Sequence, residues 1–522
     1  MSGDSDQPAK FPAIAGIILV TILVGVLTLH RIDASDVCSG NEAVEGVFLQ
    51  QMVEHGELLF PKENGIVPMY KPPLFHWTGV AIARLRGITR VTAADLRAPS
   101  ALYATAGAAL TMLFAYTIIG TEGAILAGLT LAGSYQYIGQ GRFGRVDMTL
   151  TFFETLALFA FFWWLPSDPY AAGARARVRA HLGALYLMAI AMGLAVLAKG
   201  PVGAFLPLIS ILIFMIVTNR WRQMITLLDP GAIILGGTIA SAWYVACYFA
   251  GRTEILHRQL GSENAGRFFG SLGAMAPWYY VKPILLNSVP FSLLVPIAVA
   301  MALFATDCNS SAQAQESTAK TLTADLARGS ARLFAIFWAV TIVFFSLSAY
   351  KRRSYLLPVW PGAAVLLAWW ILAIPPLKYR RATAWTFGTI CCVLAAINFF
   401  ILPSRETASC SDDSLRPAAS EIARVAGPDE PLYLFGFSEE VAPLLFYLDR
   451  DAPVITGRLG DAPPGYIVLP ASAWKTHAAE APGLEPVLTS DHGSRHLILL
   501  KHGKSYAMNS RPGFKRVTGR LP

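Results

Sequence analysis

The segment between the first two apolar stretches carries residues that could do chemistry at a membrane surface. Glu42 and Glu45 stand three apart in "EAVEGVFLQQMVEHG" and share one face if this stretch is helical. The stretch is expected to be an amphipathic helix lying along the membrane surface. Its apolar stripe consists of Val44, Phe48, Leu49, Met52 and Val53. Lys71 follows in "YKPPLFHW", where Pro72 and Pro73 stiffen the chain in an extended form. The segment therefore holds two carboxylates, which can act as general bases, and one cation at the lipid–water boundary.

The composition places the whole chain in a bilayer. Of 522 residues, 54% are apolar and only 15% are charged, and the mean hydropathy is +0.48. A soluble domain carries about 25% charged residues, so the chain is predicted to be an integral membrane protein. The net charge of +8 reflects membrane topology, and nothing in the sequence indicates nucleic-acid binding.

A spanning helix needs about 20 largely apolar residues, and about eleven stretches meet this requirement. The first is too long for a signal-peptide core and lacks a cleavage site, so it is expected to be a permanent helix. The stretch 75–90 carries two arginines and is expected to lie on the surface or to form a short re-entrant helix. The eleven stretches run near 11–30, 97–119, 122–141, 148–165, 182–198, 200–218, 230–250, 283–305, 332–349, 354–374 and 384–403.

The basic residues of the short loops predict the orientation. If the N-terminus is cytoplasmic, the inner loops are basic apart from the 119–122 turn, as expected for a cytoplasmic side. An odd number of spans then leaves the 31–96 loop and everything after about residue 404 outside. These inner loops are "ARARVRAH", "NRWRQ", the 306–331 loop and "LKYRR".

One outer loop, "YKRRSY", breaks this charge rule. Lys351, Arg352 and Arg353 lie on the side where positive charge is not expected. An anionic lipid headgroup or a phosphate group is the natural partner for such a cluster. The alternative is a solvated loop that tolerates three charges.

The tail after residue 404 predicts a small α/β domain that supports the membrane part or binds an acceptor. Cys38 and Cys410 both fall on the outer side, where a disulfide is permitted, but sequence does not supply the Cα separation that a bridge requires. Bridged and free cysteines therefore remain alternatives. The β-like runs are 431–437, 452–456, 465–470 and 496–503, and the helical ones are "LRPAASEIARVAG" and "ASAWKTHAAEA".

The order of motifs along the chain resembles a family of membrane proteins. The acidic pair, "PKENG" and "KPPLFHW" stand in the first outer loop, followed by "GRFGRVDMTLTFFETLALFAFF" and "LAKGPVG". "ENAGRFFG", "PWYYVKPILLNSVPFSLL" and "SLSAYKRRSYLLPVWPGAAVLL" follow within 263–367. Over about residues 10–405 this order is similar to the glycosyltransferase C superfamily, and in particular to protein O-mannosyltransferases and the ArnT-like aminoarabinose transferases.

The resemblance implies a fold and an activity. The fold is a polytopic α-helical membrane protein with about 11 to 13 transmembrane helices, amphipathic juxtamembrane helices and a small C-terminal α/β domain outside the cytoplasm. Residues 1–403 would be the catalytic module, with 31–96 as its first periplasmic loop, and 404–522 the periplasmic domain, in a bacterial inner membrane. Members of the family transfer a sugar from a polyprenyl-phosphate donor such as undecaprenyl phosphate, here with inversion. The acceptor is a glycolipid such as lipid A, a polysaccharide or a protein, and the sequence does not distinguish among these or identify the sugar.

Such a transfer needs a base for the acceptor hydroxyl, cations for the departing phosphate and an apolar groove for the prenyl chain. The cations expected near the outer surface can stabilise the departing phosphate, and a tyrosine can donate a further hydrogen bond to it. The residues expected to bind the donor phosphate are Lys71, Lys199, Lys351, Arg352, Arg353, Arg267 and Tyr355.

The identity of the base stays open at the level of sequence. In the family it is usually the aspartate of an Asp-Glu pair, but Asn41 stands at that position and is followed by Glu42. Tyr70 replaces the acidic residue that precedes the family's Lys-Pro-Pro. Because an amide is not a base, either Glu42 or Asp147 takes the role, with Glu45 as a further carboxylate, or transferase activity has been lost.

Three classes of function are compatible with these features: a transferase, an inactive protein that binds a lipid-linked sugar, and a transporter or flippase. The charged residues cluster at span ends and no internal repeat is evident, which favours the enzyme over the transporter. No second histidine stands at ligand spacing from His76, which is expected to be an interfacial residue and not a metal ligand. Some members of the superfamily need a divalent cation, and no set of residues here clearly forms a cage for one.

Overall fold

The chain forms two compact units. The computed structural model describes residues 10–64, 67–165, 174–271, 273–287, 289–304, 318–437, 441–448, 450–492 and 495–502. Unit 1 consists of Met1–His30, Tyr70–Phe75 and Arg97–Leu402, and unit 2 consists of Arg31–Met69, His76–Leu96 and Pro403–Pro522.

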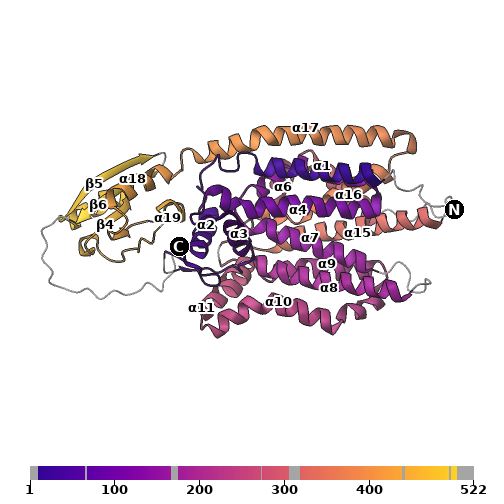
Figure 1. The fold of residues 1–522 in the computed structure, drawn as a ribbon, viewed down its shortest axis with the longest axis horizontal. Helices are drawn as coiled ribbons and strands as arrows, with labels where there is room; N and C mark the ends of the chain where they lie inside the picture. The colour runs from indigo at the N-terminus through magenta and orange to yellow at the C-terminus, as the bar shows by residue number, and fades with distance from the viewer. Residues whose placement is uncertain are drawn as a thin grey trace. The chain divides into compact units, whose positions relative to one another are not determined.

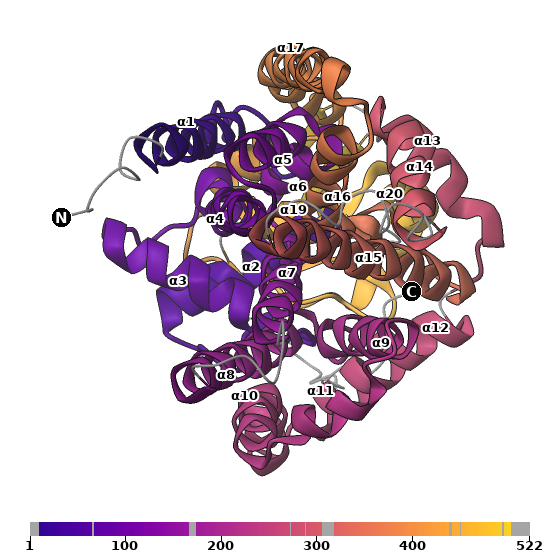
Figure 2. The same ribbon diagram turned by 90° about the vertical axis from the view of Figure 1, so that its right-hand side faces the viewer.

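Unit 1 is a bundle of apolar helices (Figure 1). Helix α7 is buried along most of its length, whereas α10 and α17 present most of their residues at the edge of the bundle (Figure 2). The helices are α1 (Lys10–Leu29), α4 (Ala93–Ile119), α5 (Thr121–Gly133), α6 (Tyr135–Gly141), α7 (Val146–Trp164), α8 (Ala174–Lys199), α9 (Val202–Val217), α10 (Pro230–Phe249), α11 (Thr253–Leu256), α12 (Arg267–Phe269), α13 (Val281–Asn287), α14 (Phe291–Phe304), α15 (Thr318–Leu347), α16 (Val359–Ala373) and α17 (Leu377–Cys410).

All eleven expected apolar stretches fall on helices, although not every one is a single straight helix. The stretch 122–141 is divided into α5 and α6 at Ser134, whose hydroxyl caps α6 by accepting a hydrogen bond from the Tyr137 amide. The stretch 283–305 is divided between α13 and α14. By length and apolar composition, six described helices can cross a membrane, or seven if the bent pair of segments ending in α14 is one span.

Two expected inner loops are partly helical. The "ARARVRAH" segment lies inside the first turns of α8, and α15 already begins at Thr318, within the expected 306–331 loop. Residues 306–317 of that loop lie outside the described residues. At the other end, α17 continues past residue 403 to Cys410.

Unit 2 joins the first outer loop to the C-terminal segment. The amide of Asn64 donates to the carbonyl of Ala452 and accepts from its N–H, at 2.7 and 2.6 Å. Cys38 and Cys410 form a disulfide with a Cα separation of 5.8 Å, which confirms the bridged alternative. The helices of this unit are α2 (Gly40–His55), α3 (Leu74–Arg86), α18 (Arg416–Ala426), α19 (Ala442–Leu448) and α20 (Ala471–His477).

The C-terminal segment contains the predicted small sheet. Its four strands follow the order β3-β4-β6-β5, with β3 parallel to β4 and the other pairs antiparallel. Three expected β-like runs became strands, and the run 452–456 contributes only a bridge between Val454 and Leu434. Strand β5 and helix α19 were not predicted. The strands are β3 (Leu432–Leu434), β4 (Tyr466–Pro470), β5 (Leu484–His492) and β6 (Arg495–His502), and a short hairpin pairs β1 (Lys62–Glu63) with β2 (Val67–Pro68).

The prediction for the first outer loop was correct about helix α2 and wrong about the surroundings of this helix. Helix α2 is buried on most of its sides within unit 2, so it does not have one apolar stripe facing a membrane surface. Phe48 and Met52 are buried as expected, but Val44 and Val53 of the expected stripe are only half-buried. Gly46 explains part of this burial, because a Cβ at that position would lie 2.7 Å from the Phe446 ring.

Candidate functional site

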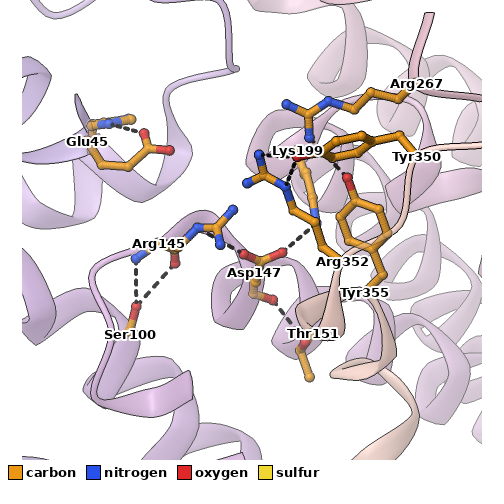
Figure 3. Close-up of polar contacts among 11 residues, drawn as sticks. Glu45, Ser100, Arg145, Asp147, Thr151, Lys199, Arg267, Tyr350, Arg352 and Tyr355 are labelled. Carbon is orange, nitrogen blue, oxygen red and sulfur yellow. Dashed lines mark hydrogen bonds and ion pairs between the residues drawn. The ribbon is translucent and has the colours of Figure 1, made fainter. Parts of the chain in front are cut away.

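Asp147 lies in the first turn of α7, the most buried of the candidate spans. A carboxylate is favourable there because the helix dipole places partial positive charge at this end. The turn before the helix is fixed by Ser100, whose hydroxyl donates to the carbonyl of Arg145 at 3.2 Å. Asp147 is 2% exposed, and its Oδ2 lies 3.5 Å from Nε of Arg145 (Figure 3).

Lys199 approaches the same carboxylate from the end of α8. Its Nζ lies 2.5 Å from Oδ1 of Asp147 and 4.6 Å from the centroid of the Tyr355 ring. Helix α8 stops here because Gly200 takes a φ of +106°, which favours glycine, and Pro201 follows. The Lys-Gly-Pro sequence therefore places an ammonium group at a helix C-terminus, where the dipole also favours it.

Arg267 and the 348–355 loop form one backbone-linked structure. The Tyr350 amide donates to the carbonyl of Arg267, and the Ala349 amide donates to that of Phe268, each at 2.9 Å. NH1 of Arg267 donates to the Tyr355 hydroxyl at 3.0 Å, and NH2 forms an ion pair with Glu263 (Figure 3).

The three basic residues of "YKRRSY" occupy different positions. Lys351 is 2% exposed, and its Nζ donates to the carbonyls of Ser348 and Met275, at 2.5 and 3.1 Å. Burial lowers the pKa of Lys351 from its ordinary value. The guanidinium of Arg352 bonds to the Tyr350 hydroxyl at 3.1 Å, whereas Arg353 is exposed. In the described contacts, Lys351 is thus engaged with backbone groups that hold the loop.

Lys71 belongs to unit 1 and is half-buried. Its charge interacts electrostatically with Asp147, and its Nζ lies 5.4 Å from the centroid of the Tyr70 ring. Arg258 also lies over this ring, at 4.3 Å. Tyr70, which replaces an acidic residue of the related motif, thus offers an aromatic face to two cations.

An apolar groove begins beside the loop that carries Tyr355. Leu356 is the next residue in the chain and lines the groove. Gln136, at the groove wall, donates to the Arg353 carbonyl at 2.9 Å and accepts from the Trp360 indole at 3.3 Å, which holds the loop against α6 and α16. Other lining residues come from α14, α15 and α16, and include Phe291, Val295, Trp338, Ile342 and Val359.

The acidic pair of the first loop is buried in unit 2. Glu45 is fully buried, and its Oε2 lies 3.0 Å from Nε2 of His76, which is also fully buried. The prediction that His76 is interfacial was therefore wrong, since its ring packs against α2. Glu42 is 1% exposed in the first turn of the same helix, and Asn41 beside it is half-buried.

Unit 1 thus brings together several of the expected residues, namely Asp147, Lys199, Arg267, Arg352 and Tyr355 (Figure 3). It also adds residues that were not singled out for the donor site: Arg145, Glu263 and Tyr350. Arg145 and Glu263 stand only two and four positions from their partners Asp147 and Arg267, a spacing that could have indicated them, whereas the contact of Tyr350 with Arg267 joins distant segments. Among the described residues, no three His, Cys, Asp or Glu side chains are grouped so that they could hold a metal ion.

The chain is similar in sequence to known membrane glycosyltransferases. Residues 18–259 match the family model of dolichyl-phosphate-mannose-protein mannosyltransferases. The chain is 24% identical to the undecaprenyl phosphate-alpha-4-amino-4-deoxy-L-arabinose arabinosyl transferase of Pectobacterium atrosepticum, over 70% of this chain and 60% of that one. It is 25% identical to an uncharacterised protein of Aquifex aeolicus, over 67% of this chain and 63% of that one. The chain therefore spans about 60% of the length of these curated relatives.

A solved structure has the same fold. The structure of ArnT from Cupriavidus metallidurans bound to undecaprenyl phosphate has a TM-score of 0.73 at 17% identity, and the match covers 93% of this chain and 97% of that one.

The long apolar helices and this fold define a multi-pass membrane protein. The chain is similar in sequence to the protein O-mannosyltransferases over residues 18–259 and to an aminoarabinose transferase over 70% of its length, and it shares the fold of ArnT.

Proposed function

We propose that this protein is an integral membrane glycosyltransferase that moves a sugar from a polyprenyl-phosphate donor to an acceptor. The observation that carries the proposal is the cationic cluster of unit 1 beside an apolar groove. Lys199 and Arg267 contact Tyr355, Arg352 bonds to Tyr350 of the same loop, and the groove begins at Leu356, the residue after Tyr355. A lipid phosphate has the complementary chemistry, with an anionic head and a long apolar tail.

The reaction follows from these groups. A carboxylate takes the proton of the acceptor hydroxyl, and the resulting oxygen forms a bond to the anomeric carbon of the sugar. The bond between that carbon and the phosphate oxygen breaks, and its electron pair leaves with the phosphate as polyprenyl phosphate. Lys199, Arg267 and Lys71 stabilise the negative charge that develops on the departing group.

We assign the base to Glu42 in preference to Asp147. The Asp147 carboxylate is engaged by Lys199 at 2.5 Å and by Arg145 at 3.5 Å, so it is already occupied by two cations of the chain. Asp147 then acts as a positioning residue that holds the two cations. Glu42 retains a carboxylate next to Asn41, the position where the family usually carries its aspartate.

The proposed location is a bacterial inner membrane with the N-terminus in the cytoplasm and unit 2 in the periplasm. The distribution of basic loop residues supports this orientation. The Cys38–Cys410 disulfide gives independent support, because such bonds persist in the oxidising periplasm and are rare in the cytosol.

The test is transfer of a radiolabelled sugar from a panel of polyprenyl-phosphate donors by purified protein in native membrane lipids, with lipid, glycan and protein acceptors. Glu42→Gln is expected to abolish turnover while donor binding remains. Glu57→Gln, an exposed carboxylate just beyond α2, is the matched control and is expected to match wild type.

Turnover by Glu42→Gln at the wild-type rate would refute the assignment of the base. Binding of the donors without turnover, with every acceptor class, would instead support the alternative that Asn41 marks a lost active site.

A further inference from the structure

Glu263 is an acidic residue within the basic cluster to which the proposed reaction gives no role. Its carboxylate forms an ion pair with NH2 of Arg267, one helical turn further along the chain. The other terminal nitrogen of Arg267 donates to the Tyr355 hydroxyl at 3.0 Å, and the guanidinium lies 5.3 Å from the centroid of the Tyr350 ring. Glu263 therefore neutralises one of the cations expected to meet the donor phosphate.

The Glu263 carboxylate can be displaced from Arg267 by another anion at a low cost in free energy. It lies in the π-helix His257–Gly266, a segment in which Gly261 and Ser262 are exposed. The side chains of Glu263 and Arg267 are 15% and 16% exposed, so water can reach either group when the pair opens. Asp147, at 2% exposure, is the opposite case, because its carboxylate is shielded from water.

In the proposed reaction, an anion of the chain that competes with the product phosphate for a cation would help the product to leave. The donor is a phosphodiester and carries one negative charge, whereas the product is a phosphomonoester with a charge of about −1.5 to −2 at neutral pH. The same cations therefore hold the product more tightly than the donor. A site built only from cations would favour transfer but retain its product.

We infer that Glu263 is a displaceable counter-ion of Arg267 that favours release of the polyprenyl-phosphate product. This inference rests on the proposed function. When a phosphate occupies the site, it forms an ion pair with Arg267, and water solvates the Glu263 carboxylate. When the product leaves, Glu263 pairs with Arg267 again, and this returning ion pair offsets part of the affinity for the product.

The experiment measures binding of undecaprenyl phosphate to the purified full-length protein in detergent. The variants are Glu263→Gln, Arg267→Gln and the double variant. Glu263→Gln is expected to bind roughly threefold to tenfold more tightly than wild type, the range set by a partly exposed ion pair. The increase is expected to vanish in the Arg267→Gln background, because the competition acts through Arg267.

A matched control and a kinetic measurement separate this role from a structural one. Glu254→Gln removes the same charge from an exposed position in α11, just before the π-helix, and is expected to bind like wild type. In Glu263→Gln, the single-turnover rate is expected to stay unchanged while multiple-turnover kcat falls and product inhibition increases.

The outcomes distinguish the inference from the proposed function. Equal or weaker binding by Glu263→Gln, in a protein whose binding still depends on Arg267, would overturn the inference and leave the donor site standing. A wild-type protein that does not bind undecaprenyl phosphate, or an Arg267→Gln variant that binds it normally, would overturn both.

Discussion

Replacing Asp147 by asparagine tests how the basic cluster is held together. The substitution keeps the shape of the side chain and removes one buried negative charge. Lys199 and Arg145 then face each other without the carboxylate that lies 2.5 Å from one and 3.5 Å from the other.

The size of the effect follows from burial. Removing one partner of a buried ion pair costs about 3–5 kcal/mol. Lys199 and Arg145 are 17% and 13% exposed, and solvent screening reduces this cost to roughly 2–3 kcal/mol. The ratio of folded to unfolded protein is then expected to fall about 30-fold to 150-fold.

Thermal unfolding in detergent, followed by tryptophan fluorescence, measures the change. Glu122→Gln is the matched control, because Glu122 is also the second residue of its helix, α5, but is exposed. Its loss is expected to cost only the helix-dipole contribution of about 0.3–1 kcal/mol. Asp147→Asn combined with Lys199→Met removes both charges and is expected to recover part of the lost stability.

The same variant distinguishes a positioning role from that of a base. Asp147→Asn is expected to weaken donor binding as well as stability, since Lys199 loses its fixed position. If its Tm falls no further than that of Glu122→Gln, the reasoning about this ion pair is wrong. If donor binding remains normal while turnover alone is lost, Asp147 is the base.

Three further substitutions test other parts of the structure. Lys71→Ala is expected to abolish donor turnover in the radiolabel assay without lowering Tm, and full activity would exclude a role for this cation. Cys38→Ser is expected to destabilise unit 2 by about 2–4 kcal/mol, so that reducing agent lowers the Tm of wild type but not of the variant. Lys351→Met leaves the carbonyls of Ser348 and Met275 without their donor and is expected to lower Tm, at about 1–3 kcal/mol for each buried carbonyl left unsatisfied, whereas a purely phosphate-binding lysine would leave Tm unchanged.

The helices of unit 1 could be predicted because their signal is local. A stretch such as 230–250 is apolar over the length that a bilayer requires, and α10 spans Pro230–Phe249. Helices were missed or wrongly bounded where a single side chain or a distant contact decides whether a helix forms and where it starts. The hydroxyl of Ser134 caps a new helix inside an apolar run, and α19 forms only seven residues, too few for a periodic pattern.

The largest error of the sequence analysis was the predicted surroundings of the first outer loop. Amphipathic spacing correctly predicted helix α2, but the same spacing cannot tell a membrane surface from a protein interior. Residues of the C-terminal segment, more than 350 positions away, cover this helix, and Phe446 packs against Gly46. Burial of Glu45 and its contact with His76 follow from that packing and not from any local feature.

The sequence by itself determined the class of protein, and it predicted the side of the membrane on which the charges gather and the residues of the candidate site. These depend on residue type and on short-range spacing, which the chain carries at every position. Only the tertiary structure decided the pairings: Lys199 with Asp147, Lys351 with backbone carbonyls, and Glu263 with Arg267. The physical reason is that a cation at a helix end can meet a carboxylate, a carbonyl or a ligand phosphate equally well. Folding brings Lys199 to Asp147 from 52 positions away and Lys351 to the Met275 carbonyl from 76 positions away, whereas Glu263 stands one helical turn from Arg267 and pairs with it because this segment is helical.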